Sequence, residues 1–254
     1  MIIAVIQARM GSTRLPGKTL LPILGRPMLA HQIDRVQRAK LVDQVILATS
    51  GHPSDEPIQQ FAQQNAIPCI RGSVDDVLDR FYQAAKRTQA EHVVRLTGDC
   101  PLSDPDIIDA VVSAHVKQHN DYTSNVHPPT YPDGFDVEVI TARALQAAWN
   151  NANKASEREH VTSYFRRTLP HVQRGNVAQE TDLSHMRLTV DEAADYEVIK
   201  AVFEAFVAQG NAFSLADVVG FLADKPDLAG KNAGIERNAG FQASLEKDAI
   251  AGAA

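Results

Sequence analysis

The segment Gln7–Lys18 combines glycine, hydroxyl and cationic residues in a pattern that suits phosphate binding. It follows a short apolar run, Ile2–Ile6, which predicts a buried strand. The segment would therefore leave the carboxyl end of that strand, where open α/β sheets bind ligands. Glycines let backbone N–H groups approach phosphate oxygens, the guanidinium of Arg9 can donate two hydrogen bonds, and Lys18 adds a mobile charge. These residues predict a phosphate-binding loop.

The segment differs from the two best-known phosphate-binding motifs. A P-loop has four residues between its first glycine and the GK[ST] triplet, whereas five residues separate Gly11 from Gly17-Lys18-Thr19. Pro16 also lacks the backbone N–H that a P-loop would use. The dinucleotide pattern GxGxxG is absent from the chain. The loop is therefore expected either to bind phosphate with a different geometry or to be only a turn.

The distribution of charge favours a compact anionic ligand. The chain has 25 Lys and Arg, 31 Asp and Glu, and a net charge of −6, which argues against a general nucleic-acid binder because phosphate backbones favour basic surfaces. Residues 1–33 nevertheless contain no Asp or Glu. The cations of that stretch are Arg9, Arg14, Lys18 and Arg26. A positive region on an acidic protein is typical of a site for an anion such as a nucleotide triphosphate.

The first half of the chain alternates strand and helix patterns. Such alternation is typical of right-handed βαβ units, so we expect an α/β fold with an open, mostly parallel sheet and helices on both faces. The 254 residues, 44% of them hydrophobic, fit one such domain with a small side arm. The expected strands lie at 2–6, 45–48, 67–70 and 92–96, and the expected helices at 28–36, 55–64, 74–82 and 104–116.

The second half has a different pattern. Residues 124–140 contain three prolines and end in the alternating run Phe135–Ile140, which predicts a hairpin or an edge strand. We expect a domain over 1–225, a small β/α arm at about 124–180, and a loosely packed tail over 226–254, rich in Gly, Ala and Asn. The further expected elements are helices at 141–153, 155–168 and 192–207 and strands at 172–177 and 186–190.

Several motifs along residues 1–223 together resemble one family. The opening segment continues to Gly25-Arg26-Pro27-Met28. The other motifs are Arg71-Gly72-Ser73 with Asp75-Asp76-Val77-Leu78-Asp79-Arg80, Leu96-Thr97-Gly98-Asp99-Cys100-Pro101-Leu102, Pro132-Asp133-Gly134-Phe135-Asp136-Val137-Glu138, and Arg187-Leu188-Thr189-Val190-Asp191. The chain resembles the cytidylyltransferases that activate acidic sugars, such as CMP-KDO synthetase. Within that group it is most similar to the spore coat polysaccharide biosynthesis protein F branch.

The resemblance implies a GT-A-like nucleotidyltransferase fold, CTP as substrate and a requirement for Mg²⁺. It assigns the triphosphate to Arg9 and Lys18, and the metal to Asp99 and Asp191. Arg9, Lys18 and Asp99 are the expected catalytic residues. The implied nucleotide-binding residues are Ala8, Arg9, Met10, Gly11, Ser12, Lys18, Ser73, Asp76 and Gly98.

The implied reaction is attack of an acceptor oxygen on the α-phosphorus of CTP with release of pyrophosphate. The acceptor would be a sugar or sugar acid of surface-polysaccharide biosynthesis, with Asp133 and Glu138 binding its hydroxyls. One or two carboxylates are enough for Mg²⁺, which prefers oxygen ligands and keeps several waters. Asp99 and Asp191 each follow a strand-like run but are far apart in sequence, so only the fold can bring them together.

Several of these residues also have a simpler interpretation. Asp99 could shape a turn before Pro101, and Asp191 could cap a helix at Glu192. Asp133 and Glu138 could be solvated carboxylates of a strand edge. Two histidine motifs belong here as well. The pair Glu159-His160 could lie near the acceptor or be structural, and His115 and His119, which have i,i+4 spacing without HExxH, are expected on an exposed helix face.

Two other functions remain open on the sequence alone. A GT-A-like glycosyltransferase would use a nucleotide sugar and carry a DxD metal motif; Asp104-Pro105-Asp106 has that form but is expected to begin a helix. A non-catalytic nucleotide-binding protein would bind CTP without metal-dependent chemistry.

The sequence also indicates where the protein works. No apolar run approaches the ~18 residues that a membrane span needs, and the N-terminal stretch does not resemble a signal peptide. Cys69 and Cys100 cannot form a disulfide framework, so we expect a cytoplasmic protein. We expect a homodimer, because the segment at about 124–180 is poorly suited to folding back on its own core. No nucleic acid or membrane partner is expected.

Overall fold

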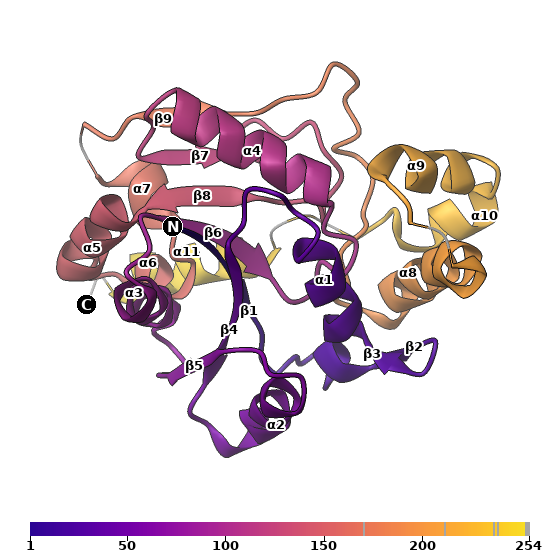
Figure 1. Cartoon of the computed structure of the whole chain (residues 1–254), viewed down its shortest axis with the longest axis horizontal. Helices are drawn as coiled ribbons and strands as arrows, with labels where there is room; N and C mark the ends of the chain where they lie inside the picture. The colour runs from indigo at the N-terminus through magenta and orange to yellow at the C-terminus, as the bar shows by residue number, and fades with distance from the viewer. Residues whose placement is uncertain (170, 211, 236, 238, 252–254) are drawn as a thin grey trace.

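The centre of the molecule is a seven-stranded sheet in the order β5-β4-β1-β6-β8-β7-β9 (Figure 1). The structure is a computed structural model that describes residues 1–169, 171–210, 212–235, 237 and 239–251. The strands of this sheet are β1 (Ile2–Gln7), β4 (Gln44–Ser50), β5 (Cys69–Gly72), β6 (His92–Thr97), β7 (Tyr122–Ser124), β8 (Glu138–Thr141) and β9 (Arg174–Asn176). Among them, β8 pairs antiparallel with both β6 and β7, while every other pairing is parallel. The expected α/β fold with a mostly parallel sheet is confirmed.

Helices cover both faces of this sheet and bury two apolar clusters. One cluster joins the sheet to α1, α2, α4, α8 and α9, and the other joins it to α3, α5 and α7. The α-helices are α1 (Met28–Val36), α2 (Glu56–Gln64), α3 (Val77–Thr88), α4 (Pro105–Lys117), α5 (Ala142–Asn151), α6 (Ala155–Glu159), α7 (Ser163–Arg167), α8 (Ala193–Phe206), α9 (Leu215–Ala223), α10 (Pro226–Ala229) and α11 (Ala239–Ala251). The short elements are η1 (Lys18–Leu20), β2 (Pro22–Ile23), β3 (Arg26–Pro27), η2 (Pro53–Asp55), η3 (Val207–Gln209) and η4 (Gly230–Asn232).

Strand β1 shows why its sequence is continuously apolar. Successive side chains of a strand point to opposite faces, and both faces of this sheet are covered. Ile3 and Val5 belong to one cluster, Ala4 and Ile6 belong to the other, and all of them are fully buried. The carboxyl end of β1 is thereby held rigidly between β4 and β6.

The second half departs from the expected elements in three places. Phe135–Ile140 was expected to form a hairpin or an edge strand; the strand, β8, lies inside the sheet between β6 and β7. The strand expected at 186–190 is not formed, because this stretch makes a single bridge, between Arg187 and Asp133. The helix expected at 155–168 is divided into α6 and α7, where Val161 has a φ of +53° that no helix allows.

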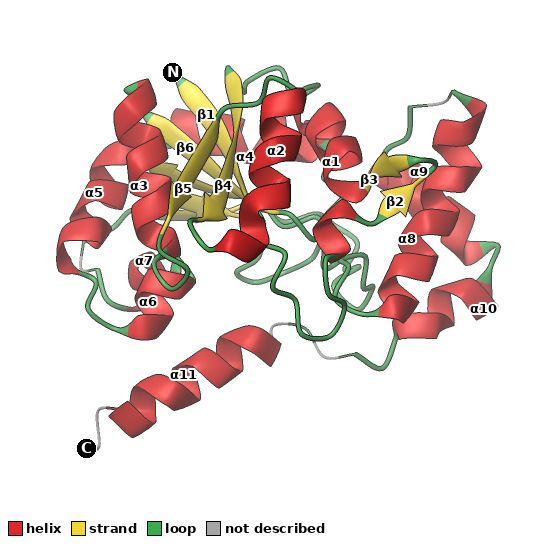
Figure 2. Cartoon of the chain, turned by 90° about the horizontal axis from the view of Figure 1, so that it is seen from below, coloured by secondary structure: helices red, strands yellow, loops and turns green. Residues whose placement is uncertain are grey.

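The C-terminal residues, expected to be loosely packed, form α10, η4 and α11. Helix α11 is a rod at the margin of the molecule, packed against α6 (Figure 2). No helix among the described residues is long and apolar enough to cross a membrane.

Candidate active site

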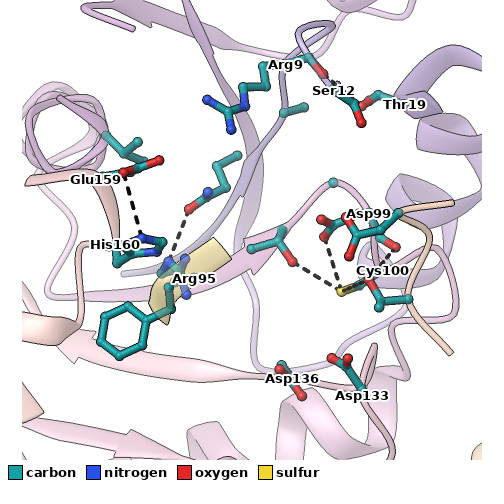
Figure 3. Close-up of a pocket in the computed structure, with 18 of the residues that line it drawn as sticks. Arg9, Ser12, Thr19, Arg95, Asp99, Cys100, Asp133, Asp136, Glu159 and His160 are labelled. Atoms are coloured by element: carbon teal, nitrogen blue, oxygen red, sulfur yellow. Dashed lines mark hydrogen bonds and ion pairs between the residues drawn. The ribbon is translucent and has the colours of Figure 1, made fainter. Parts of the chain in front are cut away.

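A polar cavity of about 620 Å³ opens at the carboxyl ends of β1 and β6. Its lining comes from the loop after β1, the turn after β6, and parts of the stretches 126–138, 159–166 and 187–191. Figure 3 shows Arg9 and Ser12 above the cavity, Glu159 and His160 at one side, and Asp99 at the other. Segments that are far apart in the sequence therefore meet where the sequence predicts a ligand.

The loop after β1 is fixed by hydrogen bonds that run through its own backbone and to its neighbours. The N–H of Met10 donates to Asp55 Oδ1 at 2.7 Å, and the N–H of Gly17 donates to the carbonyl of Met10 at 3.1 Å. Gly17 has a φ of +70°, a left-handed conformation that glycine adopts without a Cβ penalty. The Thr19 hydroxyl donates to the carbonyl of Arg9 at 3.2 Å. The loop closes on itself and brings Lys18 to the edge of the cavity.

Most of the predicted nucleotide-binding residues lie together, and three do not. The lining residues among them are Ala8, Arg9, Gly11, Ser12, Lys18 and Gly98. Met10, Ser73 and Asp76 are outside the lining. Met10 packs against the core, and Asp76 caps α3 by accepting the Asp79 N–H at 2.9 Å and is paired with Arg158.

Gly98 occupies a position with no room for a side chain. A Cβ there would lie 3.0 Å from the Cβ of Ala8 and 3.1 Å from the carbonyl oxygen of Gln7. The N–H of Gly98 also donates to that Gln7 carbonyl at 2.8 Å. The ends of β1 and β6 are thus joined closely, which places Asp99 beside the phosphate loop.

The ammonium of Lys18 joins the two aspartates that the sequence singled out. Its Nζ lies 3.1 Å from Asp99 Oδ2 and 2.8 Å from Asp191 Oδ1, and it donates to the carbonyl of Val190 at 2.7 Å. Burial by itself would lower the pKa of Lys18, but the two carboxylates outweigh it and raise the pKa. Two carboxylates from distant parts of the chain therefore converge on a single positive charge.

Asp191 is held by a second, more deeply buried ion-pair network. Arg187 places NH2 2.9 Å from Asp191 Oδ2, Nε 2.9 Å from Asp195 Oδ1, and NH1 3.2 Å from Asp133. Asp195 is fully buried and accepts the N–H groups of Asp191 and Glu192, each at 2.9 Å. Burial would raise the pKa of Asp191, but Lys18 and Arg187 outweigh it and lower the pKa, so the carboxylate stays ionised.

These contacts bear on the simpler interpretations of Asp191 and Asp99; Asp99 does lie in the turn after β6. The N-cap of α8 is Glu192, in a capping box with Asp195, so Asp191 is not the cap. The carbonyl of Asp99 accepts the Val190 N–H at 2.8 Å, while its carboxylate turns to Lys18. Both carboxylates therefore face the cavity, with the main chain around them fixed by other groups.

The opposite wall carries the predicted acceptor residues, Asp133 and Glu138. Glu138 is buried and paired with Arg95 and Tyr122; burial would raise its pKa, but Arg95 outweighs this and lowers it. Asp133 pairs with Arg187. Gly134, between them, has a φ of +107°, and a Cβ there would lie 2.3 Å from the Leu188 carbonyl oxygen. This wall is packed tightly against residues 187–191, and neither carboxylate is a solvated strand-edge group.

Sequence reasoning missed several residues that shape the cavity: Arg95, Asp136, Arg166, Arg187 and Phe241. The sequence did offer a signal for Arg187, which stands four residues before Asp191 and eight before Asp195. Asp136 stands within the motif Pro132–Glu138, but the sequence offered no signal for Arg95, Arg166 and Phe241, whose places depend on which segments meet in the fold. The pKa of Asp136 is raised to about 7 by burial, against the opposing effect of Arg237.

Two other predicted motifs lie away from the cavity. His115 was expected on an exposed helix face; this is wrong, because His115 is fully buried between His92 and Thr123. Its Nε2 lies 3.1 Å from His92 Nδ1, and its Nδ1 lies 3.1 Å from Thr123 Oγ1. Asp104 of the DxD-like motif caps α4 by accepting the N–H of Asp106 at 2.9 Å and is outside the cavity lining. The motif therefore gives no support to a glycosyltransferase.

Comparison with known proteins identifies the family. The family model described as "Cytidylyltransferase" matches residues 3–217. The chain belongs to the cytidylyltransferase family. This cytidylyltransferase is 33% identical over 235 residues to the spore coat polysaccharide biosynthesis protein SpsF of Bacillus subtilis, covering 90% of this chain and 96% of that protein. It is thus an enzyme, a CTP-dependent nucleotidyltransferase.

Solved structures agree with this assignment. A cytidylyltransferase from Leptospira borgpetersenii matches with a TM-score of 0.85 and 31% identity over 93% of this chain and 99% of that chain. A CMP-2-keto-3-deoxy-manno-octonic acid synthetase solved with CTP matches with a TM-score of 0.60 and 20% identity, covering 80% and 98%. At that identity the second match shows the fold alone, which confirms the predicted nucleotidyltransferase fold.

Proposed function

We propose that this cytidylyltransferase transfers CMP from CTP to a sugar or sugar acid in the biosynthesis of a surface polysaccharide. The observation that carries the proposal is the convergence of Asp99 and Asp191 on Lys18, directly beside the predicted phosphate loop. The name of the Bacillus subtilis relative, a spore coat polysaccharide biosynthesis protein, supports this class of acceptor.

The proposed reaction is a displacement at phosphorus. An oxygen of the acceptor forms a bond to the α-phosphorus of CTP and loses its proton, while the bond from that phosphorus to the oxygen bridging to the β-phosphate breaks. Pyrophosphate leaves with the electrons of that bond. Negative charge therefore grows on the phosphate oxygens, and catalysis depends on positioning and on positive charges placed in advance.

The residues of the loop have distinct roles in this proposal. Arg9 is exposed at the cavity and can donate two hydrogen bonds to the β- or γ-phosphate. Lys18 neutralises charge near the α-phosphate, where its two carboxylate partners already fix its position. The backbone of Ala8–Ser12 follows the nucleotide at close range, because glycine at position 11 leaves the space beside it open.

Asp99 and Asp191 fit a magnesium ion by the chemistry of their oxygen donors. In this structure both carboxylates contact the ammonium group of Lys18. Carboxylate oxygens are also the ligands that Mg²⁺ prefers. No group of three or more His, Cys, Asp or Glu side chains suited to a metal occurs among the described residues. The chain would thus supply two carboxylates, with waters and phosphates as the other ligands. When bound, the ion would supply positive charge to the α-phosphate and the attacking oxygen.

The test is release of pyrophosphate from CTP and Mg²⁺ with a panel of nonulosonic acids, sugar phosphates and phosphonates. We expect turnover with at least one acceptor and a loss of about 100-fold or more in kcat for Asp99→Asn. Asp75→Asn, which changes an exposed carboxylate outside the cavity, is the matched control and should keep its activity. Absence of turnover with every acceptor, or full activity of Asp99→Asn, would contradict the proposal.

We also propose that the enzyme is a cytoplasmic homodimer. Both Cys69 and Cys100 are free thiols, as expected for a reducing compartment. Burial raises the pKa of Cys100, which keeps its thiol protonated and unreactive. Light scattering should report twice the chain mass, and a value of 27.7 kDa would contradict the dimer.

A further inference from the structure

Arg237, from the C-terminal part of the chain, reaches into the wall of the cavity. Its NH2 lies 2.6 Å from Asp136 Oδ1, its Nε lies 3.8 Å from Asp133 Oδ1, and its NH1 donates to the carbonyl of Tyr131 at 3.3 Å. The guanidinium thus spans two carboxylates on the side opposite the phosphate loop. Charge-assisted pairs of this kind fix the orientation of both partners.

Phe241, four residues later in the sequence and within α11, lines the cavity itself. Its ring meets the imidazole of His160 edge to face, with centroids 5.0 Å apart at 84°, and the guanidinium carbon of Arg166 lies 5.0 Å from the ring centroid. Most other lining side chains are charged or polar. Phe241 therefore supplies an aromatic surface within a polar cavity.

Helix α11 is anchored beyond these two residues. The Ser244 hydroxyl lies 2.9 Å from His160 Nε2 and donates to Glu159 Oε2 at 2.9 Å. Further along, Asp248 accepts the N–H of Ser156 at 3.2 Å. Helix α6 thus holds α11, and α11 in turn holds Phe241 at the cavity (Figure 2).

The space left for the acceptor lies between these groups. With the triphosphate on the loop after β1 and the α-phosphate at Lys18, the part of the cavity lined by Asp133, Asp136 and His160 is left for the acceptor. Figure 3 shows Asp133 and Asp136 at the bottom of the view and His160 at the left, with Arg9 and Ser12 at the top. Carboxylates and guanidinium groups bind hydroxyls and acidic groups, and an aromatic ring packs against the C–H face of a sugar ring.

We propose that Arg237 and Phe241 are acceptor-specificity residues, which the C-terminal segment adds to an otherwise nucleotide-binding cavity. This inference rests on the proposed function. Phe241 packs against the sugar ring, and Arg237 orients Asp133 and Asp136 toward the acceptor's hydroxyls. Both residues lie beyond residue 217, where the match to the family model ends. The C-terminal part therefore adds two groups to a wall whose other residues lie within the matched stretch.

The test is steady-state kinetics of Arg237→Ala and Phe241→Ala with CTP and the panel acceptor that the unmodified enzyme uses best. We expect the acceptor KM to rise about 10-fold or more in each variant, as expected for the loss of one charged or aromatic contact, with the CTP KM within about twofold. The conservative variants Arg237→Lys and Phe241→Leu should recover part of the loss. Lys231→Ala is the matched control, because Lys231 pairs with Glu197 outside the cavity.

The outcomes separate this inference from the proposed function. An unchanged acceptor KM in both alanine variants, with normal turnover, would overturn the specificity roles and leave the proposed function intact. An equal rise of both KM values with a lowered melting temperature would also overturn them, because it would show a structural role. Absence of turnover by the unmodified enzyme with every acceptor would overturn both.

Discussion

The two sides of the cavity are built in different ways. The proposed nucleotide side is a contiguous loop, residues 8–18, on a rigid buried strand; part of its hydrogen bonding lies within the loop, and Asp55, Asp99 and Asp191 hold it from outside. The acceptor side is assembled from residues 133–138, 159–166, 187–195 and the C-terminal part, held by ion pairs between them. A contiguous loop has few outside contributors, whereas an assembled wall changes whenever one of its several segments changes. The contiguous loop suits a substrate that stays the same, and the assembled wall suits a substrate that varies.

The largest expected effect comes from breaking the contact that joins the two sides. Lys18→Met removes the charge between Asp99 and Asp191, so kcat/KM for CTP should fall about 1,000-fold, the loss typical of a preorganised charge at the reacting group. The measurement is initial-rate kinetics across CTP concentrations. Lys40→Met, which changes an exposed lysine outside the cavity, should keep its rate. A fall of less than tenfold for Lys18→Met would show that the two sides act independently.

The next effect tests how tightly the acceptor side is assembled. Gly134→Ala puts a Cβ 2.3 Å from the Leu188 carbonyl oxygen at a φ of +107°, so the backbone must move. We expect a loss of about 3 to 5 kcal/mol in the free energy of unfolding, from overlap and strain together. Urea denaturation measures it. Gly220→Ala, in a helix with open space around it, should be neutral or slightly stabilising, and equal stabilities of the two variants would refute the tight packing.

The smallest expected effect is a change of stability with pH, which depends on the buried side chain of His115. His115 of α4 links His92 of β6 to Thr123 of β7, and burial lowers its pKa from 6.5 to about 4. Because the folded-state pKa is depressed, the unfolded chain binds more protons between these values. Stability should be complete above about pH 6.5 and fall by up to about 3 kcal/mol as the pH drops toward 4.

Urea denaturation between pH 4 and 7 measures this dependence. His115→Gln should be less stable at pH 7 but lose part of the slope between pH 4 and 6.5. An identical slope in both proteins would show that the histidines do not carry the effect.

The strand and the loop of the proposed nucleotide side could be predicted from local sequence patterns. Continuous apolar runs predict strands covered on both faces, and alternation with helices predicts a parallel sheet, because such strands need crossover connections. The loop Gln7–Lys18 could be recognised from the sequence because its glycines and cations lie within twelve consecutive residues. Local hydrogen bonds and the backbone conformation of Gly17 shape this loop, while the partners of Lys18 come from distant parts of the chain.

The arrangement of the proposed acceptor side could not be predicted from local sequence. That Asp191 faces Lys18, that β8 enters the sheet, that His115 is buried and that Arg237 reaches Asp136 all depend on contacts between residues 8 to 173 positions apart. Ion pairs and burial are set by which segments meet, and no residue type or spacing encodes the partner. A cation in the C-terminal tail has the same sequence signature whether it is solvated or closes a binding site.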